Sequence, residues 1–277
     1  QKDVTDFMKE QVIEVKNYIS KSNLPSTDFV INPYIGCPHK CMYCYASFMK
    51  RFTNHLEAWG DFVDVKICGK PLNTRNLCGK NLVIGSVTDP YNIYEKKYEI
   101  TRNILHQLVA TPVSVDIITK SDLVARDMDI LSKLHKVKVV LSINSFDDSF
   151  RFDVEPYAPS IKRRIQTLRT LYNSGIPTVL FMSPIFPEIT DFKRIIEETK
   201  DFVCEYWFEN LNLRSAYKQR VLDYVYKKYP DLMFLYQDIF VFNNNSYWLF
   251  LREKIEQYCR EESLNYSVFF HYGRVSG

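Results

Sequence analysis

Hydrophobic residues along this chain recur in two alternating patterns: short β-branched runs, and longer segments with apolar residues at helical spacing. The strand-like runs occupy residues 28–35, 81–87, 113–120, 138–144, 176–183 and 205–213. Each of the first five is followed by a segment with a helical pattern. Six β–α units result, and this alternation predicts a parallel sheet covered by helices.

Two of the helical segments have clear apolar faces. The first is formed by Leu123, Met128, Leu131 and Leu134, and the second by Ile161, Ile165, Leu168 and Tyr172, ahead of a turn at Gly175. Three features are expected outside the six units: an extra segment at residues 61–80, a C-terminal helix around Trp248, Leu251, Ile255 and Cys259, and a last strand at residues 266–272. The pattern therefore predicts an α/β fold of the barrel type with extensions at both ends.

Composition narrows the class of protein. A chain of 277 residues with 46% hydrophobic and 15% aromatic content can bury a large core, which excludes disorder. We find no Pro/Gly/Ser-rich linker, so we expect one domain over residues 1–277. Apolar runs such as "IPTVLFMSPIF" are shorter than a membrane span, and we expect a soluble, cytoplasmic protein. A net charge of +3 does not by itself imply a polyanionic partner.

Three of the seven cysteines lie close together in "YIGCPHKCMYCYA", directly after the first predicted strand. In an α/β barrel the loops at the carboxyl ends of the strands form the functional site, so Cys37, Cys41 and Cys44 are candidate metal ligands. A cubane iron–sulfur cluster usually takes four thiolates, and three would leave one iron open to another ligand. Two alternatives stay open: a zinc site with His39 as fourth ligand, and a purely structural role.

The spacing C-x3-C-x2-C, with Tyr43 before the last cysteine, resembles the cluster-binding motif of the radical S-adenosylmethionine (radical SAM) superfamily. Together, "INPYIGCPHKCMYCYA", "GSVTDPYNIYEKKYEITRNIL" and "ITKSDLVARDMDIL" resemble the branch related to spore photoproduct lyase. The resemblance covers roughly residues 28–215. It implies a partial (β/α)6 barrel of the radical SAM type, with that span as its core and residues 216–277 as a C-terminal extension.

The resemblance also implies a chemistry. Cys37, Cys41 and Cys44 would hold a 4Fe-4S cluster whose open iron binds S-adenosylmethionine. An electron from the cluster would cleave that cofactor into methionine and a 5′-deoxyadenosyl radical, which takes a hydrogen atom from a substrate. An external electron donor of the flavodoxin or ferredoxin type is implied as a partner.

Polar residues at the predicted strand ends are candidate contacts to S-adenosylmethionine. Thr88 and Asp89 offer oxygen acceptors to its amino group, although Asp89 is also typical of a turn ahead of Pro90. The resemblance implies that Lys120 pairs with its carboxylate; otherwise Lys120 is an ordinary solvated strand end.

Further candidates lie in the cysteine loop and after the fourth strand. Ser142 and Asn144 are candidates for the ribose or the carboxylate of the cofactor, and small polar residues are also common at strand ends without any ligand. Tyr43 is expected to pack over the cluster or the adenine, whereas Tyr45 is expected to begin the next helix and join the core.

The segment "RFDVEPYAPSIKRR" has two interpretations. The first is a loop that leads into a helix, with Ser160 as N-cap and Arg163 and Arg164 on a solvated face. The second places Glu155 near the cofactor or substrate and an arginine opposite an anion. Both interpretations stay open.

Two departures from the related branch matter. In spore photoproduct lyase a cysteine after the second strand quenches the product radical, and Ser86 stands in the matching place here. The remaining cysteines lack the paired spacing of a second cluster, and we expect most of them to be buried small hydrophobes: Cys68, Cys78, Cys204 and Cys259.

Two classes of function follow. The first is a radical SAM enzyme of lyase or oxidoreductase type whose substrate is unidentified: a nucleic-acid base, a peptide or a small metabolite. The alternatives are a non-enzymatic iron–sulfur or zinc protein, and a nucleic-acid lesion lyase. No residue beyond the ligands is assigned a catalytic role.

Overall fold

A computed structural model describes residues 8–272, with only the backbone of residues 215 and 216. Its main sheet has the order β11-β10-β9-β8-β7-β6-β3-β2, and the neighbouring strands are parallel except where β2 meets β3. The strands are β2 (Ile19–Lys21), β3 (Phe29–Ile31), β6 (Asn81–Ile84), β7 (Ser114–Thr119), β8 (Lys136–Ser142), β9 (Thr178–Ile185), β10 (Glu205–Asn210) and β11 (Tyr266–Val268). Within residues 8–272 the edges β2 and β11 do not pair, so the sheet is the open, partial barrel that we expected.

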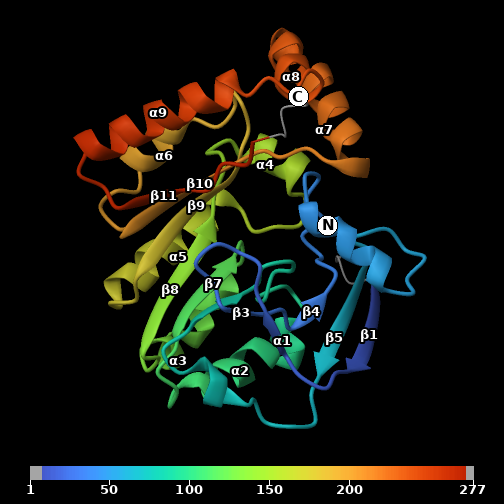
Figure 1. Cartoon of the computed structure of the whole chain (residues 1–277), viewed down its shortest axis with the longest axis vertical. Coiled ribbons are helices and arrows are strands. Elements are labelled where there is room, and N and C mark those ends of the chain that lie inside the picture. Colours follow the sequence, from blue (N-terminus) through green and yellow to red (C-terminus); the bar gives the residue numbers. More distant parts are fainter. Residues whose placement is uncertain (1–7, 273–277) are drawn as a thin grey trace.

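Helices cover one face of this sheet (Figure 1). They are α1 (Glu95–Tyr98), α2 (Ile100–Leu108), the 3-10 helix η4 (Asp122–Asp127), α3 (Met128–Leu131), α4 (Asp148–Val154), α5 (Ile161–Asn173) and α6 (Phe192–Glu197). Side chains alternate along β7 and β10 between fully buried and half-buried positions, as strand geometry requires. The fully buried side chains form the core under the helices, and the half-buried ones line the concave face.

The helix predictions hold in part. Helix α5 begins after Ser160, whose hydroxyl accepts a hydrogen bond from the Arg163 N–H, so the predicted N-cap is confirmed. The segment after β7 is not one regular helix, because it divides into η4 and the short α3. The strand predicted at 205–213 ends at Asn210, and the last strand covers only Tyr266–Val268.

The strand predicted at residues 28–35 divides at Asn32 and Pro33. Its first part is β3 in the main sheet, and its second part, β4 (Tyr34–Ile35), belongs to a small sheet of order β1-β5-β4. Pro33 lacks the backbone N–H that a continuing strand would donate, so the strand ends there. The side-chain amide of Asn32 donates to the Ser86 hydroxyl at 2.9 Å. The small sheet also contains β1 (Lys9–Glu14) and β5 (Phe62–Ile67), the latter within the predicted extra segment.

The C-terminal extension is helical and lies at the far end of the molecule from α2 and α3 (Figure 1). It comprises α7 (Ser215–Lys228), the 3-10 helix η5 (Pro230–Leu232), α8 (Met233–Phe240) and α9 (Ser246–Glu261). The predicted apolar face of α9 is confirmed, because Trp248, Leu251, Ile255 and Cys259 are all buried. Every helix among residues 8–272 is too short or too polar to span a lipid bilayer.

Candidate active site

The cysteine loop, residues 36–44, leaves β4 and closes over the carboxyl end of the main sheet. Gly36 has a φ of +87°, and a Cβ atom there would lie 2.2 Å from the Phe62 carbonyl oxygen, so only glycine fits. The Thr88 hydroxyl donates to the Gly36 carbonyl at 2.6 Å, and the Met42 N–H donates to the Val154 carbonyl at 2.8 Å. The loop is therefore tied to β5, to the turn after β6 and to α4.

The three loop cysteines are free thiols and partly buried. Burial raises the pKa of Cys44 to about 11 and the pKa of Cys41 well above its ordinary value, and the ammonium of Lys120 opposes the rise at both. Since a metal takes the thiolate, binding of iron or zinc here would release protons.

His39, between Cys37 and Cys41, points toward Asp89. Its Nδ1 lies 3.3 Å from an Asp89 carboxylate oxygen, and both side chains are buried. Burial alone would lower the pKa of His39, but the carboxylate of Asp89 and the thiol sulfur of Cys37 outweigh it and raise the pKa to about 10. The carboxylate beside Nδ1 leaves Nε2 available to a metal, so this contact does not exclude His39 as a zinc ligand.

Asp89 is already surrounded by donors. It accepts from the Tyr91 N–H at 2.9 Å, the Thr119 hydroxyl at 2.6 Å and the Lys120 N–H at 2.7 Å, besides facing His39. Burial alone would raise the pKa of Asp89, yet His39 and these donors lower it to about 2. The predicted turn is confirmed by the Tyr91 contact. The predicted contact of Thr88 and Asp89 with a cofactor stays a prediction.

A second buried carboxylate, Glu155, joins residues from three separate segments of the chain. Its Oε1 accepts from the Tyr43 hydroxyl and lies 4.0 Å from the Lys120 ammonium, and its Oε2 accepts from Arg164 Nη2 at 2.5 Å. Burial alone would raise the pKa of Glu155, but Arg164 and Lys120 outweigh it and hold the pKa below its ordinary value. The carboxylate is therefore ionised, and a protonated Lys120 lies beside the loop that carries the cysteines.

Ser142 and Asn144 lie at the end of β8, next to this group. Arg164 Nη1 donates to the Ser142 carbonyl at 3.0 Å, and the Asn144 amide lies 3.4 Å from the Tyr43 hydroxyl oxygen. The fold thus brings Tyr43, Lys120, Ser142 and Asn144 close together, and their contact with a cofactor stays a prediction.

The residues of this site fit an iron–sulfur cluster and its cofactor. Two side-chain polar atoms in the described part of the chain are buried without a hydrogen-bond partner: Trp59 Nε1 and Asn144 Oδ1. Both lie beside the cysteine loop, and buried unsatisfied groups mark places where an additional ligand can bind. Among the described residues no three or more His, Cys, Asp or Glu side chains are placed to hold a single metal ion, so the fit to a cluster rests on the chemistry of the three loop thiols.

Several sequence predictions are wrong in this region. Arg164 is fully buried on Glu155 and does not face solvent, whereas Arg163 is exposed and paired with Asp122 at 2.6 Å. Tyr45 begins the 3-10 helix η2 (Tyr45–Phe52) as expected, yet it is half-exposed and not part of the core. Of the other cysteines only Cys259 is buried; Cys78 and Cys204 are exposed.

Trp59 is the site residue that the sequence did not indicate. It lies in the connection between η2 and β5, outside any strand, helix or motif, and only the packing of that connection on Phe62 and Lys40 brings it beside the cysteine loop.

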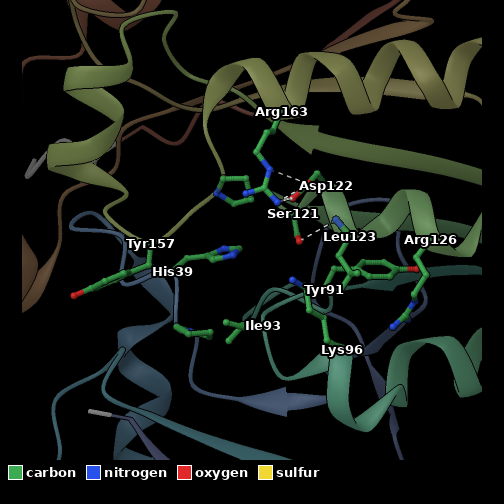
Figure 2. A pocket seen from close by; sticks show the side chains of 12 residues that line it. His39, Tyr91, Ile93, Lys96, Ser121, Asp122, Leu123, Arg126, Tyr157 and Arg163 are labelled. Atoms are coloured by element: carbon green, nitrogen blue, oxygen red, sulfur yellow. Dashed lines mark hydrogen bonds and ion pairs between the residues drawn. The ribbon is translucent and has the colours of Figure 1, made fainter. Parts of the chain in front are cut away.

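A cavity of about 350 Å3 opens on the other side of His39 (Figure 2). Its lining includes His39, Tyr91, Lys96, Arg126, Tyr157 and Arg163, and contains none of Cys37, Cys41, Cys44, Lys120 and Glu155. Two of its cations are neutralised: Arg163 by Asp122, and Arg126 by Asp127 at 2.7 Å. The cavity therefore borders the cysteine loop through Pro38 and His39 but does not reach the thiols, Lys120 or Glu155.

Two proteins from other organisms are similar to this chain in sequence. An uncharacterised protein of Methanocaldococcus jannaschii is 40% identical over 220 residues, which are 79% of this chain and 83% of that protein. An uncharacterised protein of Acidianus two-tailed virus is 33% identical over 58% of this chain and 57% of its own length.

Solved structures share the fold. Spore photoproduct lyase complexed with dinucleoside spore photoproduct superposes with a TM-score of 0.67 at 15% identity, over 95% of this chain and 82% of that chain. Streptococcus suis SuiB bound to S-adenosylmethionine gives a TM-score of 0.55 at 16% identity, over 97% and 51%. The family model of the radical SAM superfamily matches residues 31–203, more than half of the chain. With its partial barrel and its cysteine loop, the chain therefore belongs to the radical SAM superfamily.

Proposed function

We propose that this protein is a radical SAM enzyme of lyase or oxidoreductase type that removes a hydrogen atom from an organic substrate. The observation that carries the proposal is the position of three cysteine thiols beside a partly buried lysine, Lys120, and an unpaired buried amide oxygen, Asn144 Oδ1. Thiolates bind iron, and the remaining groups offer hydrogen bonds to a polar cofactor.

Cys37, Cys41 and Cys44 would hold three irons of a 4Fe-4S cluster. When bound, the cluster and S-adenosylmethionine would supply removal of a hydrogen atom from the substrate, with one electron taken from an external donor and with methionine and 5′-deoxyadenosine as products. The partly buried loop would limit the access of water and stray reductants to this position.

Lys120 would pair with the carboxylate of S-adenosylmethionine. Its contact with Glu155, at 4.0 Å, is longer than a hydrogen bond, so the ammonium keeps donors for an incoming anion. Asn144 Oδ1 and Ser142 would accept from ribose hydroxyls, and Tyr43 would pack over the cluster or the adenine. Thr88 and Asp89 remain proposed for the amino group; the existing contacts of Asp89 also give it a role in positioning His39 and Lys120.

The substrate would lie on the concave face of the sheet. Near the carboxyl end of this face, Glu209 is half-buried and accepts from the Ser183 hydroxyl at 2.5 Å, and it lies 3.1 Å from His271 Nε2. A nucleic-acid base, a peptide or a small metabolite would offer polar groups to this carboxylate.

The decisive experiment is anaerobic reconstitution with iron and sulfide, followed by reduction in the presence of S-adenosylmethionine. We expect a brown protein that slowly forms 5′-deoxyadenosine and methionine without substrate. A colourless protein with stoichiometric zinc would favour the non-enzymatic alternative, and S-adenosylhomocysteine alone would indicate methyl transfer.

Repair of spore photoproduct is not the activity we propose. Ser86 occupies the place of the hydrogen-donating cysteine, its hydroxyl accepts from the Asn32 amide at 2.9 Å, and an O–H bond is much stronger than an S–H bond. Incubation of the reconstituted enzyme with dinucleotide photoproduct should release no thymine. Many turnovers would instead make a nucleic-acid lesion lyase the leading function.

Three further points belong to this proposal. The electron donor would be a flavodoxin or a ferredoxin. The seven cysteines, all free in the structure, suit the reducing cytoplasm. We also propose a single radical SAM domain with a core at about residues 28–215 and a C-terminal extension at 216–277.

A further inference from the structure

The surface that follows the cysteine loop exposes several large apolar side chains. Phe48, Phe52 and Leu56 come soon after Cys44, and their exposed fractions are 43%, 65% and 94%. Lys50 Nζ donates to the Leu56 carbonyl at 3.2 Å, which holds Leu56 beside η2. A single exposed apolar side chain needs no explanation, but a group of them marks a surface that another molecule covers.

The same surface carries positive charge without a counter-charge. Lys50 and Arg51 form no ion pair with any residue that the structure describes. The two carboxylates of the segment between Cys44 and β5, Glu57 and Asp61, each pair with a lysine outside that segment. The surface therefore combines apolar groups with two unbalanced cations. This η2 patch is made of Phe48, Lys50, Arg51, Phe52 and Leu56.

The η2 patch is fixed close to the cysteines. Cys44 directly precedes η2, and the Ser47 N–H donates to the Cys44 carbonyl at 3.4 Å. A 3-10 helix rises about 2 Å per residue, so Phe48 lies about 8 Å along the helix axis from Cys44. At the other end of the segment, a Cβ atom on Gly60 would lie 2.8 Å from Lys40 Cγ, so this end rests on the cysteine loop. The patch is thus an exposed surface a short distance from the proposed cluster ligands.

We propose that the η2 patch is the docking surface for an acidic electron-carrier protein that delivers one electron to the cluster. The inference rests on the proposed function and assigns a surface to its electron donor. The carrier is oxidised by one electron and the cluster is reduced by one, so each carrier molecule must bind, deliver its electron and leave. Interfaces below about 1,200 Å2 suit such short encounters, and unpaired cations speed the approach of an acidic partner.

Other occupants fit the η2 patch less well. The Arg51 Cζ lies 5.5 Å from the centroid of the Phe48 ring and 4.7 Å from that of Phe52, so the guanidinium covers ring faces on which a nucleic-acid base would stack. A second copy of the chain in a two-fold dimer would bring the same patch against itself and place like charges together. A partner rich in carboxylates meets neither obstacle, because it pairs with the cations and packs its apolar groups on Leu56.

The first test measures affinity and requires no enzymatic activity. A flavodoxin and a ferredoxin, both of net negative charge, are titrated by calorimetry into the unchanged protein, Arg51→Glu and Phe52→Ser. We expect Arg51→Glu to bind its carrier about 5- to 30-fold more weakly, because the reversed charge replaces an attraction by a repulsion. Phe52→Ser should also bind more weakly, because it removes an exposed ring from the interface.

The control reverses a matched cation elsewhere. Lys254 Nζ lies 4.3 Å from the ring centroid of the exposed Phe250 in α9, so Lys254→Glu changes a similar cation and ring pair in the C-terminal extension. It should bind the carrier like the unchanged protein. Equal carrier affinity in Arg51→Glu and the unchanged protein, or no binding of either carrier, would overturn the inference.

The second test separates docking from catalysis in the reconstituted enzyme. Formation of 5′-deoxyadenosine is followed with the reduced carrier and, in parallel, with photoreduced deazaflavin, a small reductant that needs no docking surface. We expect Arg51→Glu to lose carrier-driven product and to keep deazaflavin-driven product. No product with either reductant in the unchanged protein would overturn the proposed function, whereas equal carrier-driven rates in both proteins would overturn only the docking surface.

Three outcomes would assign the η2 patch to another occupant and overturn the inference. Two of them are binding of a single-stranded oligonucleotide or of anionic lipid vesicles that Arg51→Glu abolishes, in a protein that binds no carrier. The third is a dimer of the unchanged protein that Phe52→Ser separates in sedimentation experiments.

Discussion

Glu95 and Glu155 are both fully buried glutamates, but different groups donate hydrogen bonds to their carboxylates. Glu95 Oε2 accepts from the Tyr34 hydroxyl at 2.5 Å and the Thr101 N–H at 2.9 Å, and its Oε1 accepts from the Arg102 N–H at 3.1 Å and Arg126 Nη2 at 2.9 Å. Each oxygen thus has two donors, and two of the four are backbone amides that cannot move away.

Glu155 has donors of a different kind. All of them are side chains, and Lys120 and the Asn144 amide lie at 4.0 and 3.5 Å from its Oε1, which is too long for strong hydrogen bonds. The Asn144 Oδ1 beside it has no partner among the described residues. A carboxylate with a full set of hydrogen-bond donors stabilises the fold, whereas an incomplete set leaves polar groups that can bind a ligand. Of the two glutamates, only Glu155 has an incomplete set.

The largest effect should come from replacing one of the three cysteines beside the Glu155 group, which are the proposed ligands of the cluster. Replacement of Cys37, Cys41 or Cys44 by Ala should abolish iron binding and the visible absorption after reconstitution, because a cubane needs all three thiolates. The Glu95 group, which contacts no cysteine, should keep these variants folded, as circular dichroism will show. The exposed Cys78 provides the control: Cys78→Ala should bind iron like the unchanged protein. Full iron content in Cys44→Ala would contradict the assignment.

The two glutamates can then be compared directly. Glu155→Gln leaves the fully buried Arg164 without its carboxylate and should lower the free energy of unfolding by about 3–5 kcal/mol in urea titrations. Glu95→Gln should lower it by less, because the partly buried Arg126 keeps Asp127 as a partner. Only Glu155→Gln should also weaken binding of S-adenosylmethionine, measured by anaerobic calorimetry on the folded fraction. Equal affinity of both variants for S-adenosylmethionine would contradict the inference that only the Glu155 group offers contacts to the cofactor.

A smaller change should isolate the cofactor contact. Lys120→Met removes one charged donor, which is worth about 1.5–3 kcal/mol and corresponds to roughly 10- to 150-fold weaker binding of S-adenosylmethionine. Iron content should not change, because Lys120 is not a ligand. The control is Lys96→Met, in the cavity that is shown in Figure 2, and it should leave the affinity for S-adenosylmethionine unaltered. Unchanged affinity in Lys120→Met would argue against the carboxylate contact.

The smallest effect concerns a carboxylate that, unlike those of Glu95 and Glu155, has no hydrogen-bond donor among the described residues. Asp116, on the concave face of β7, accepts no hydrogen bond from the described residues, and burial raises its pKa to about 6, with Lys138 opposing and Glu205 adding to the rise. Its charge therefore costs stability as the pH rises from about 4 to above 6, since the unfolded chain ionises first. Asp116→Asn should match the unchanged protein at pH 4 and be about 1–3 kcal/mol more stable at pH 8. A pH-independent difference in urea titrations would show that the charge is not the cause.

Much of the fold and part of the site were predictable, because local spacing carries them. The apolar faces of α5 and α9 follow from helical periodicity, and the N-cap Ser160 from its position before α5. The cysteine loop and Lys120 follow strands, and parallel strands bring their carboxyl ends together at one edge of a sheet. These features depend on neighbours in sequence or on a general rule of architecture.

The sequence alone determined the family and the spacing of the three cysteines, which are encoded in short segments, and the partial barrel, which follows from the alternation of strand and helix patterns along the chain. It did not determine which charged residues are buried. Arg163 and Arg164 are adjacent in sequence, yet one is exposed and the other is fully buried. The tertiary structure decided this, as it decided the packing of Trp59 on Phe62 beside the cysteine loop. These outcomes depend on contacts between segments far apart in the chain, and the energy of such a contact exists only after the fold has brought the partners together.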